Sequence, residues 1–147
     1  MTVIAHRHPT TDPPARRADD PAFQAYALLR IGFVVAPILF GLDKFAHVLV
    51  NWDRYLAPEL VDLLPGNAHQ LMYAVGVIEV VAGVVVAVRP RFGAYLVAAW
   101  LAGIIVNLLV LGAYYDIALR DFGLLLAALS LARLATVFDR PTVPAQP

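Results

Sequence analysis

The most constraining feature of the sequence is an apolar run from Leu28 to His47, which is long enough to cross a lipid bilayer and yet contains Arg30, Asp43 and Lys44. A charged side chain in the hydrocarbon layer costs at least about 2.5 kcal/mol, so such residues face protein or water instead of lipid. Arg30, Pro37 and Lys44 follow one another at intervals close to two helical turns and therefore share one helix face. We expect this face to point into the protein.

The composition places the chain among membrane proteins with a single domain. Of its 147 residues, 61% are hydrophobic, and the mean hydropathy is +0.72; both lie above the range of ordinary soluble domains. Because the net charge is zero, there is no basic field to attract nucleic acid. The chain has no cysteine, which excludes disulfides and thiolate metal sites, so redox chemistry here would need an external cofactor.

Four apolar segments can each cross a bilayer, since each has the roughly 20 residues required. Their predicted limits are residues 23–48, 69–88, 92–112 and 117–138. The second and third connections are so short that the helices they join must pack antiparallel. The sequence therefore predicts an all-α, polytopic membrane protein, with an antiparallel four-transmembrane-helix bundle over residues 23–138.

The first connection, residues 51–67, is longer and mixes apolar with charged residues. Pro58 stands where the first turn of a helix tolerates proline, and Pro65 would end that helix. We predict a short amphipathic interfacial helix, lying on the membrane surface with Trp52 and Tyr55 at headgroup depth. A lid over a binding site is the alternative interpretation.

Residues 1–22 and 139–147 are polar and rich in proline, and they lack the periodicity of a helix or strand. Such segments cannot bury enough apolar surface to offset the entropy of ordering, so we expect two disordered tails. His6 and His8 in the first tail are interpreted as solvated side chains. The apolar run that follows is too long for a cleaved signal peptide and is expected to remain as the first span.

Basic residues near the ends of the spans predict the orientation in the membrane. On the side of the termini lie Arg7, Arg16, Arg17, Arg89, Arg91, Arg133 and Arg140. Lys44 and Arg54 fall on the other side. We therefore expect both termini to be cytoplasmic.

Polar residues inside the other three segments share their helix faces with small residues, which mark contacts between membrane helices. The three stripes are Glu79 with Gly76 and Gly83, Asn107 with Gly93, Trp100 and Gly103, and Asp121 with Ala128, Ala132 and Ala135. Counted at about 1.5 Å per residue from the cytoplasmic ends, Arg30 and Glu79 lie at similar depth. We predict an intramembrane ion pair between them, because pairing is the cheapest way to bury both charges.

A second polar layer is predicted in the outer half of the bundle. Its members are Lys44, Trp100, Asn107, Asp116, Arg120 and Asp121. The first interpretation is a pocket that opens away from the cytoplasm and holds the head of a quinone or another small polar ligand. The alternative is that Lys44 pairs with Asp121 and only locks the bundle. Two pairs at i, i+4 spacing are also expected, Asp116 with Arg120 and Asp43 with His47.

No metal site and no catalytic residues are predicted. Asp43, His47 and Asp116 could approach one another near His69 at the outer surface, but both histidines lie at a membrane boundary and need no metal to explain them. Ser130, the only serine, is surrounded by alanine and leucine, far from any histidine, so a nucleophile with its base is missing.

Three short stretches resemble DoxX-type membrane proteins. They are Arg30-Ile31-Gly32, Gly41-Leu42-Asp43-Lys44-Phe45, and Glu79 four residues before Gly83. The likeness covers residues 25–137, and the plan of four helices is also similar to the small membrane subunits of thiosulfate:quinone oxidoreductase. The resemblance implies a four-helix bundle in the cytoplasmic membrane of a bacterium, working beside redox or stress-protection partners. It carries over no catalytic residue.

We therefore expect an accessory or ligand-binding membrane component with a polar intramembrane core. One alternative is a quinone-interacting subunit of an oxidoreductase, with Lys44 and Asp121 near the quinone oxygens and proton exchange through Asp116. Another is a transporter of small solutes or protons, which with so few helices would have to act as a homo-oligomer. No cofactor other than a quinone is expected.

Overall fold

The computed structural model of the chain describes residues 18–63 and 67–139, and these residues form helices without any strand. In chain order the elements are α2 (Pro21–Ala46), η1 (Trp52–Tyr55), α3 (Pro58–Leu63), α4 (Ala68–Val88), α5 (Pro90–Leu111) and α6 (Tyr115–Phe138). The predicted tails, with His6 and His8, and Pro65 in the first connection lie almost entirely outside the described residues.

The all-α fold with four long apolar helices is confirmed. α2, α4, α5 and α6 are each long and apolar enough to cross a membrane, and their limits fall within two residues of the predicted ones. The short helix α3 between the first two spans begins at Pro58, as expected. The chain is therefore a multi-pass membrane protein.

Local sequence signals explain where the long helices begin and end. Asp20 caps α2 by accepting a hydrogen bond from the Ala22 N–H, and Pro21 occupies the first helical position, where its missing N–H costs nothing. Asn67 and Gln70 form a capping box at the start of α4. Gly112 ends α5 in the left-handed conformation (φ 67°) that glycine adopts without strain.

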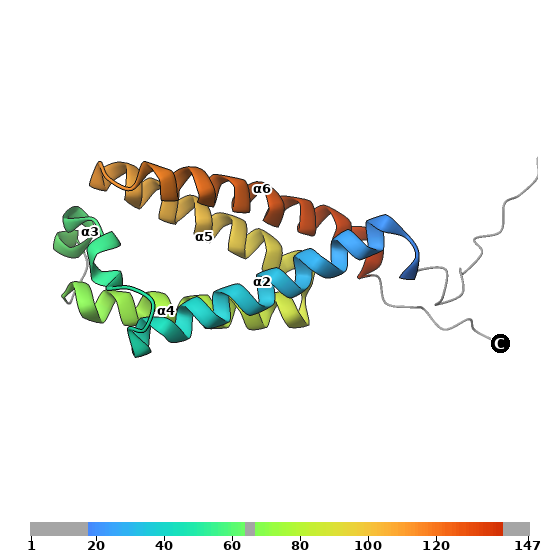
Figure 1. Cartoon of the computed structure of the whole chain (residues 1–147), viewed down its shortest axis with the longest axis horizontal. Coiled ribbons are helices and arrows are strands. Elements are labelled where there is room, and N and C mark those ends of the chain that lie inside the picture. Colours follow the sequence, from blue (N-terminus) through green and yellow to red (C-terminus); the bar gives the residue numbers. More distant parts are fainter. Residues whose placement is uncertain (1–17, 64–66, 140–147) are drawn as a thin grey trace, which may run out of the picture.

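The four helices form two close pairs, α2 with α4 and α5 with α6, and contacts between the pairs are fewer. Figure 1 shows that the pairs converge at the end where α2 begins and α6 ends, and diverge toward η1 and α3. The main apolar core lies where they converge and includes Phe33, Val86 and Leu131. The rings of Phe23 and Tyr26 close this end against Phe138, each with its centroid 5.5 Å away.

Glycines bring α2 and α4 together. A Cβ atom at Gly41 would lie 2.6 Å from the carbonyl oxygen of Gly76, and one at Gly76 would lie 2.8 Å from the carbonyl oxygen of Gly41. A Cβ atom at Gly76 would also lie within 3.1 Å of side-chain atoms of Phe45 and Lys44 on α2. The predicted role of Gly76 as a small contact residue is therefore confirmed.

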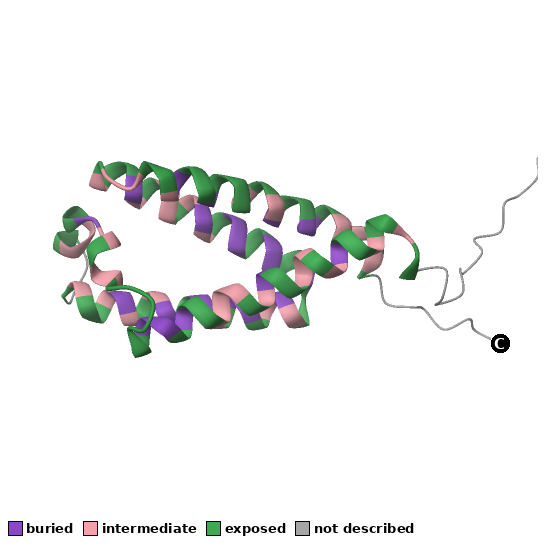
Figure 2. Cartoon of the chain, viewed as in Figure 1, coloured by how far each residue is buried: buried purple, intermediate pink, exposed green. Residues whose placement is uncertain are grey.

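Many residues on the outside of the bundle are exposed (Figure 2), and large apolar residues are prominent among them. Leu28, Val88 and Leu119 are each more than 70% exposed, and many other large apolar residues of the four long helices are exposed with them. In contrast, Asp43, Lys44, Glu79 and Asp121 are buried. This inverted arrangement suits a lipid solvent, which solvates leucine and valine but not charge.

Candidate functional site

The centre of the polar interior is an ion pair between Lys44 and Glu79. The Lys44 ammonium donates to Glu79 Oε2 at 2.6 Å, and the two side chains are only 4% and 11% exposed. Lys44 lies one turn beyond Gly41 on α2, and Glu79 lies one turn beyond Gly76 on α4, so the glycine contact places them side by side. The predicted ion pair between Arg30 and Glu79 is therefore wrong.

Arg30 does not reach Glu79, because it lies beside the end of α4. Its guanidinium donates to the carbonyl oxygen of Ala87 at 2.6 Å and to the hydroxyl of Tyr26 at 3.2 Å. Ala87 is eight residues beyond Glu79, which is about 12 Å along the helix axis. Arg30 thus binds the last turn of α4, where unpaired carbonyl groups and the helix dipole favour a cation.

Asp43 organises the chain that leaves α2. Its Oδ1 accepts hydrogen bonds from the N–H groups of Val48 and Leu49 at 3.1 Å, and its Oδ2 accepts from Trp52 Nε1 at 2.7 Å. The expected side-chain pair of Asp43 with His47 does not form, because the carboxylate is already occupied. Trp52, held in this way, places its ring 4.0 Å from the Lys44 ammonium, which gives the buried cation a second stabilising partner.

Asn107 fastens the connection between α2 and α4 to α5. Its Nδ2 donates to the carbonyl oxygen of Tyr55 at 2.6 Å, and its Oδ1 accepts from the N–H of Ala57 at 2.9 Å. Ala57 is fully buried beneath this contact. Asn107 is therefore not a free ligand of the predicted pocket, because both ends of its amide are used. We call residues 52–57, held by Asn107 and Asp43, the cap.

Asp121 and Trp100 are buried with incomplete partners. Asp121 makes one hydrogen bond among the described residues, a long one of 3.4 Å from Arg120 Nε, whose own side chain is 65% exposed. The Nε1–H of Trp100 is buried and has no hydrogen-bond partner in the described part of the chain. Both residues lie near enough to Glu79 to act on its carboxylate. Neither of them makes a short side-chain hydrogen bond within the described part of the chain.

Two other predicted pairs are absent. Lys44 does not pair with Asp121, because its ammonium is bound to Glu79. Asp116 is exposed and has no ion pair with Arg120 among the described residues, since Arg120 reaches toward Asp121 instead. The structure thus brings Lys44, Trp100 and Asp121 to the same region around Glu79, but it leaves Asp116 at the surface and gives Asn107 to the cap.

A groove of about 510 Å³ opens between α3 and α5 near this region. Its lining is mostly apolar and consists of Glu59, Leu60, Leu63, Ala102, Gly103, Val106, Asn107 and Val110. Gly103 lies one turn from Trp100 on the same face of α5, and a Cβ atom there would meet nothing within 4 Å. Gly103 was expected at a helix contact but is exposed in the groove. A second groove of about 410 Å³, entirely apolar, follows the outer face of α2.

The sequence did not identify the residues of the cap as part of the interior. Trp52 was assigned to the membrane surface, and no role was expected for the backbone of Tyr55 and Ala57. One signal was present, because Trp52 follows Lys44 by eight residues, and an aromatic ring attracts a cation. The contact of Asn107 with the cap spans some fifty residues and has no local signal.

The fold and the polar interior define a four-helix, multi-pass membrane protein with buried charges. Comparisons with models of known protein families, with curated proteins and with solved structures find no match. The resemblance to DoxX-type proteins therefore stays a prediction.

Proposed function

We propose that this protein is a DoxX-like, ligand-binding component of the bacterial cytoplasmic membrane, and that it holds the polar head of a lipophilic molecule of the quinone type at Trp100 and Asp121. The observation that carries the proposal is the buried Trp100 N–H, which makes no hydrogen bond within the described part of the chain, together with the buried Asp121 carboxylate, whose one hydrogen bond there is long. Unpaired buried polar groups cost free energy, so a ligand that pairs them is bound favourably.

The donors and acceptors of this region match the head of a quinone or quinol. A quinone carbonyl oxygen accepts a hydrogen bond from the Trp100 N–H, and a quinol hydroxyl donates one to the Asp121 carboxylate. Lys44, which a quinone-reactive subunit would place near the quinone oxygens, is already bound to Glu79. We therefore propose binding without turnover.

The groove between α3 and α5 supports the proposal, because it offers a path for an apolar tail. Its volume of about 510 Å³ is in the range of ligand pockets. Gly103 leaves this path open one turn from Trp100. A tail in the groove and a head at Trp100 would resemble the usual binding site for an amphiphile, with apolar walls and a few polar groups.

We further propose that both termini are cytoplasmic, so that the cap faces the other side of the membrane. The excess of arginine near the termini supports this orientation. A redox or stress-protection protein would then act as the partner of this accessory component.

The test uses the intrinsic fluorescence of Trp52 and Trp100, the only tryptophans. We expect decylubiquinone to quench the fluorescence of the purified protein in mild detergent saturably. Gly103→Leu fills the groove and should raise the half-saturating concentration at least tenfold. Gly123→Leu is the matched control, since Gly123 is exposed and also has nothing within 4 Å of an added Cβ.

Quenching that is linear in quinone concentration, or equal in the two leucine variants, would contradict the proposal, because it would report partition into the detergent micelle. Mass spectrometry of lipids extracted from the purified protein provides a second readout. A quinone present at about one per chain in the wild type and lost in Gly103→Leu agrees with the proposal.

A further inference from the structure

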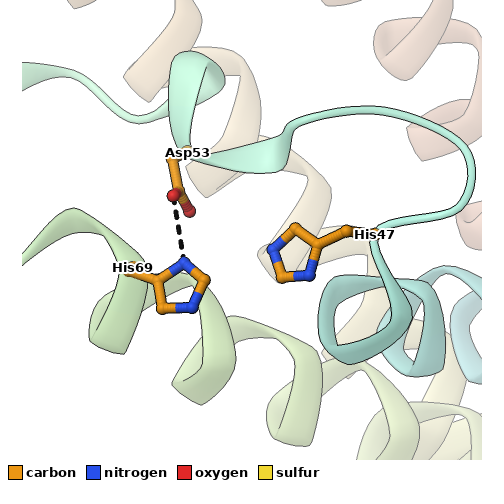
Figure 3. Close-up of side chains that lie close together, drawn as sticks. All are labelled: His47, Asp53 and His69. Atoms are coloured by element: carbon orange, nitrogen blue, oxygen red, sulfur yellow. Dashed lines mark hydrogen bonds and ion pairs between the residues drawn. The ribbon is translucent and has the colours of Figure 1, made fainter.

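Two histidines and an aspartate from three different elements converge at the edge of the cap. His47 follows the last turn of α2, Asp53 lies in η1, and His69 lies in the first turn of α4 (Figure 3). One ligand atom from each, a ring nitrogen or a carboxylate oxygen, lies within 4.8 Å of the other two. His69 Nδ1 and Asp53 Oδ2 are 3.1 Å apart.

We propose that His47, Asp53 and His69 bind a divalent transition-metal ion, for which Zn²⁺ is the best match. Two imidazole nitrogens and one carboxylate oxygen are a known set of three protein ligands for zinc, with a fourth position open to water. Ligands at zinc-binding distances in a tetrahedral site are roughly 3.3 Å apart. The distance between His69 and Asp53 already has this size, and small rotations of the rings bring His47 into range.

The carboxylate of Asp53 offers an unused ligand atom. Its Oδ1 is buried and has no hydrogen-bond partner in the described part of the chain, although the residue itself is only half-buried. A buried carboxylate oxygen without a donor is costly. A metal ion that bound both oxygens of this carboxylate would satisfy it.

His47 is held in a position that favours metal binding. Its backbone is in the left-handed region (φ 52°), where glycine is the usual residue at a helix end, and its N–H donates to the carbonyl oxygen of Asp43 at 2.7 Å. Its Nδ1 lies 3.4 Å from the carbonyl oxygen of Phe45. This contact leaves Nε2 free, and Figure 3 shows one ring nitrogen of His47 facing Asp53 and His69. A hydrogen bond on one ring nitrogen is the common way to orient a metal-binding histidine.

The surroundings are favourable for a cation. The rings of His47 and His69 are stacked at 5.2 Å between centroids, and Tyr73 packs 4.4 Å from His69. The buried cation Lys44, three residues before His47 in the chain, is neutralised by Glu79. With neutral imidazoles the three ligands carry one negative charge, which attracts a divalent ion.

A bound ion would join the end of α2, η1 and the start of α4. Asp53 follows Trp52 directly, and Trp52 covers Lys44, so the ion would fix the cap over the polar interior. The metal site does not depend on the proposed quinone site, because its ligands are separate and its test contains no quinone.

The test is a titration of the purified full-length chain in detergent. We expect one Co²⁺ per chain to give the visible absorption bands of a tetrahedral site and Zn²⁺ to displace it stoichiometrically. His47→Ala and His69→Ala should abolish these bands. Asp53→Asn, which keeps the shape of the side chain, should weaken Zn²⁺ binding at least about 10-fold.

The control is the double variant His6→Ala, His8→Ala, which removes the other two histidines of the chain and should bind with unchanged affinity. Thermal unfolding of each variant without metal verifies that it is folded, and a given concentration of Zn²⁺ should raise the midpoint of Asp53→Asn less than that of the wild type. Absence of saturable binding by the wild type would overturn the proposal. Binding that survives in His69→Ala, or that is lost with the tail histidines, would overturn it as well.

Discussion

The two basic residues of α2 are stabilised by different kinds of partner. Lys44 is neutralised by a carboxylate and covered by the Trp52 ring. Arg30 has no carboxylate partner among the described residues and binds the carbonyl oxygen of Ala87 in the last turn of α4. The longer, forked guanidinium suits this second role, since it reaches a helix end and still donates to Tyr26.

Replacement of Arg30 should act independently of Glu79. We expect Arg30→Met to lower the free energy of unfolding by about 1.5–3 kcal/mol, the value of a hydrogen bond from a charged group. Its effect should add to that of Glu79→Gln within about 0.5 kcal/mol, because the two residues share no partner. Unfolding by denaturant in mild detergent measures both.

Arg133→Met is the control for this prediction, since Arg133 is an exposed arginine of α6 and its loss should change stability by no more than about 0.5 kcal/mol. A coupling energy above about 1 kcal/mol between Arg30 and Glu79 would contradict the assignment of Arg30 to the end of α4.

For single residues, the sequence was sufficient to predict which charged side chains are buried but not which residues they bind. The cost of charge in lipid identified Lys44, Glu79 and Asp121 as interior residues, and all three are buried. The choice between Arg30 and Lys44 as partner of Glu79 depended on the axial offset of α2 and α4. An error of a few residues in the point at which a helix enters the membrane changes the estimated depth of a side chain by a full turn or more. Depth estimated from residue numbers could therefore not identify the partner of Glu79.

Among the elements, the contact between α2 and α4 determines the geometry of the ion pair. Gly41 and Gly76 let the two backbones approach so closely that each would clash with a Cβ on the other. This approach brings the lysine of one helix to the glutamate of the other. The short sequence around Gly41 thus contains both the glycine of the helix contact and Lys44, the charged residue that this contact places next to Glu79.

Gly41→Ala should separate α2 from α4. Because the added Cβ would lie 2.6 Å from a backbone oxygen, which cannot rotate away, we expect a loss of about 1–3 kcal/mol in the free energy of unfolding. Gly123→Ala on α6 meets nothing and should be neutral or stabilising by up to about 1 kcal/mol. Equal unfolding midpoints for the two variants in detergent would show that the contact between Gly41 and Gly76 does not contribute to stability.

The element limits could be predicted, whereas the packing of the cap could not. Hydropathy and the position of Pro58 were enough for four long helices and one short one. The cap, in contrast, depends on Asn107 holding backbone groups of Tyr55 and Ala57. Such contacts between distant segments follow from the folded structure and leave no periodic signal in the chain.

The whole molecule has apolar outer faces and an interior in which the charges meet. The pairing of the helices, α2 with α4 and α5 with α6, was not predicted, because short connections indicate only which helices run antiparallel. Small residues explain the pairs: glycines join α2 to α4, and buried alanines of α6, among them Ala128 and Ala132, form its contact face. Toward the cap the two pairs diverge (Figure 1).

A double-mutant cycle on Lys44 and Glu79 tests most directly whether charges inside this membrane protein are buried because they pair with each other. Lys44→Met and Glu79→Leu keep the size of the side chains, and each alone leaves an uncompensated buried charge that should cost about 3–5 kcal/mol. We predict that the double variant loses clearly less than the sum, with a coupling energy of at least about 1 kcal/mol in detergent unfolding. Additive losses would contradict the account.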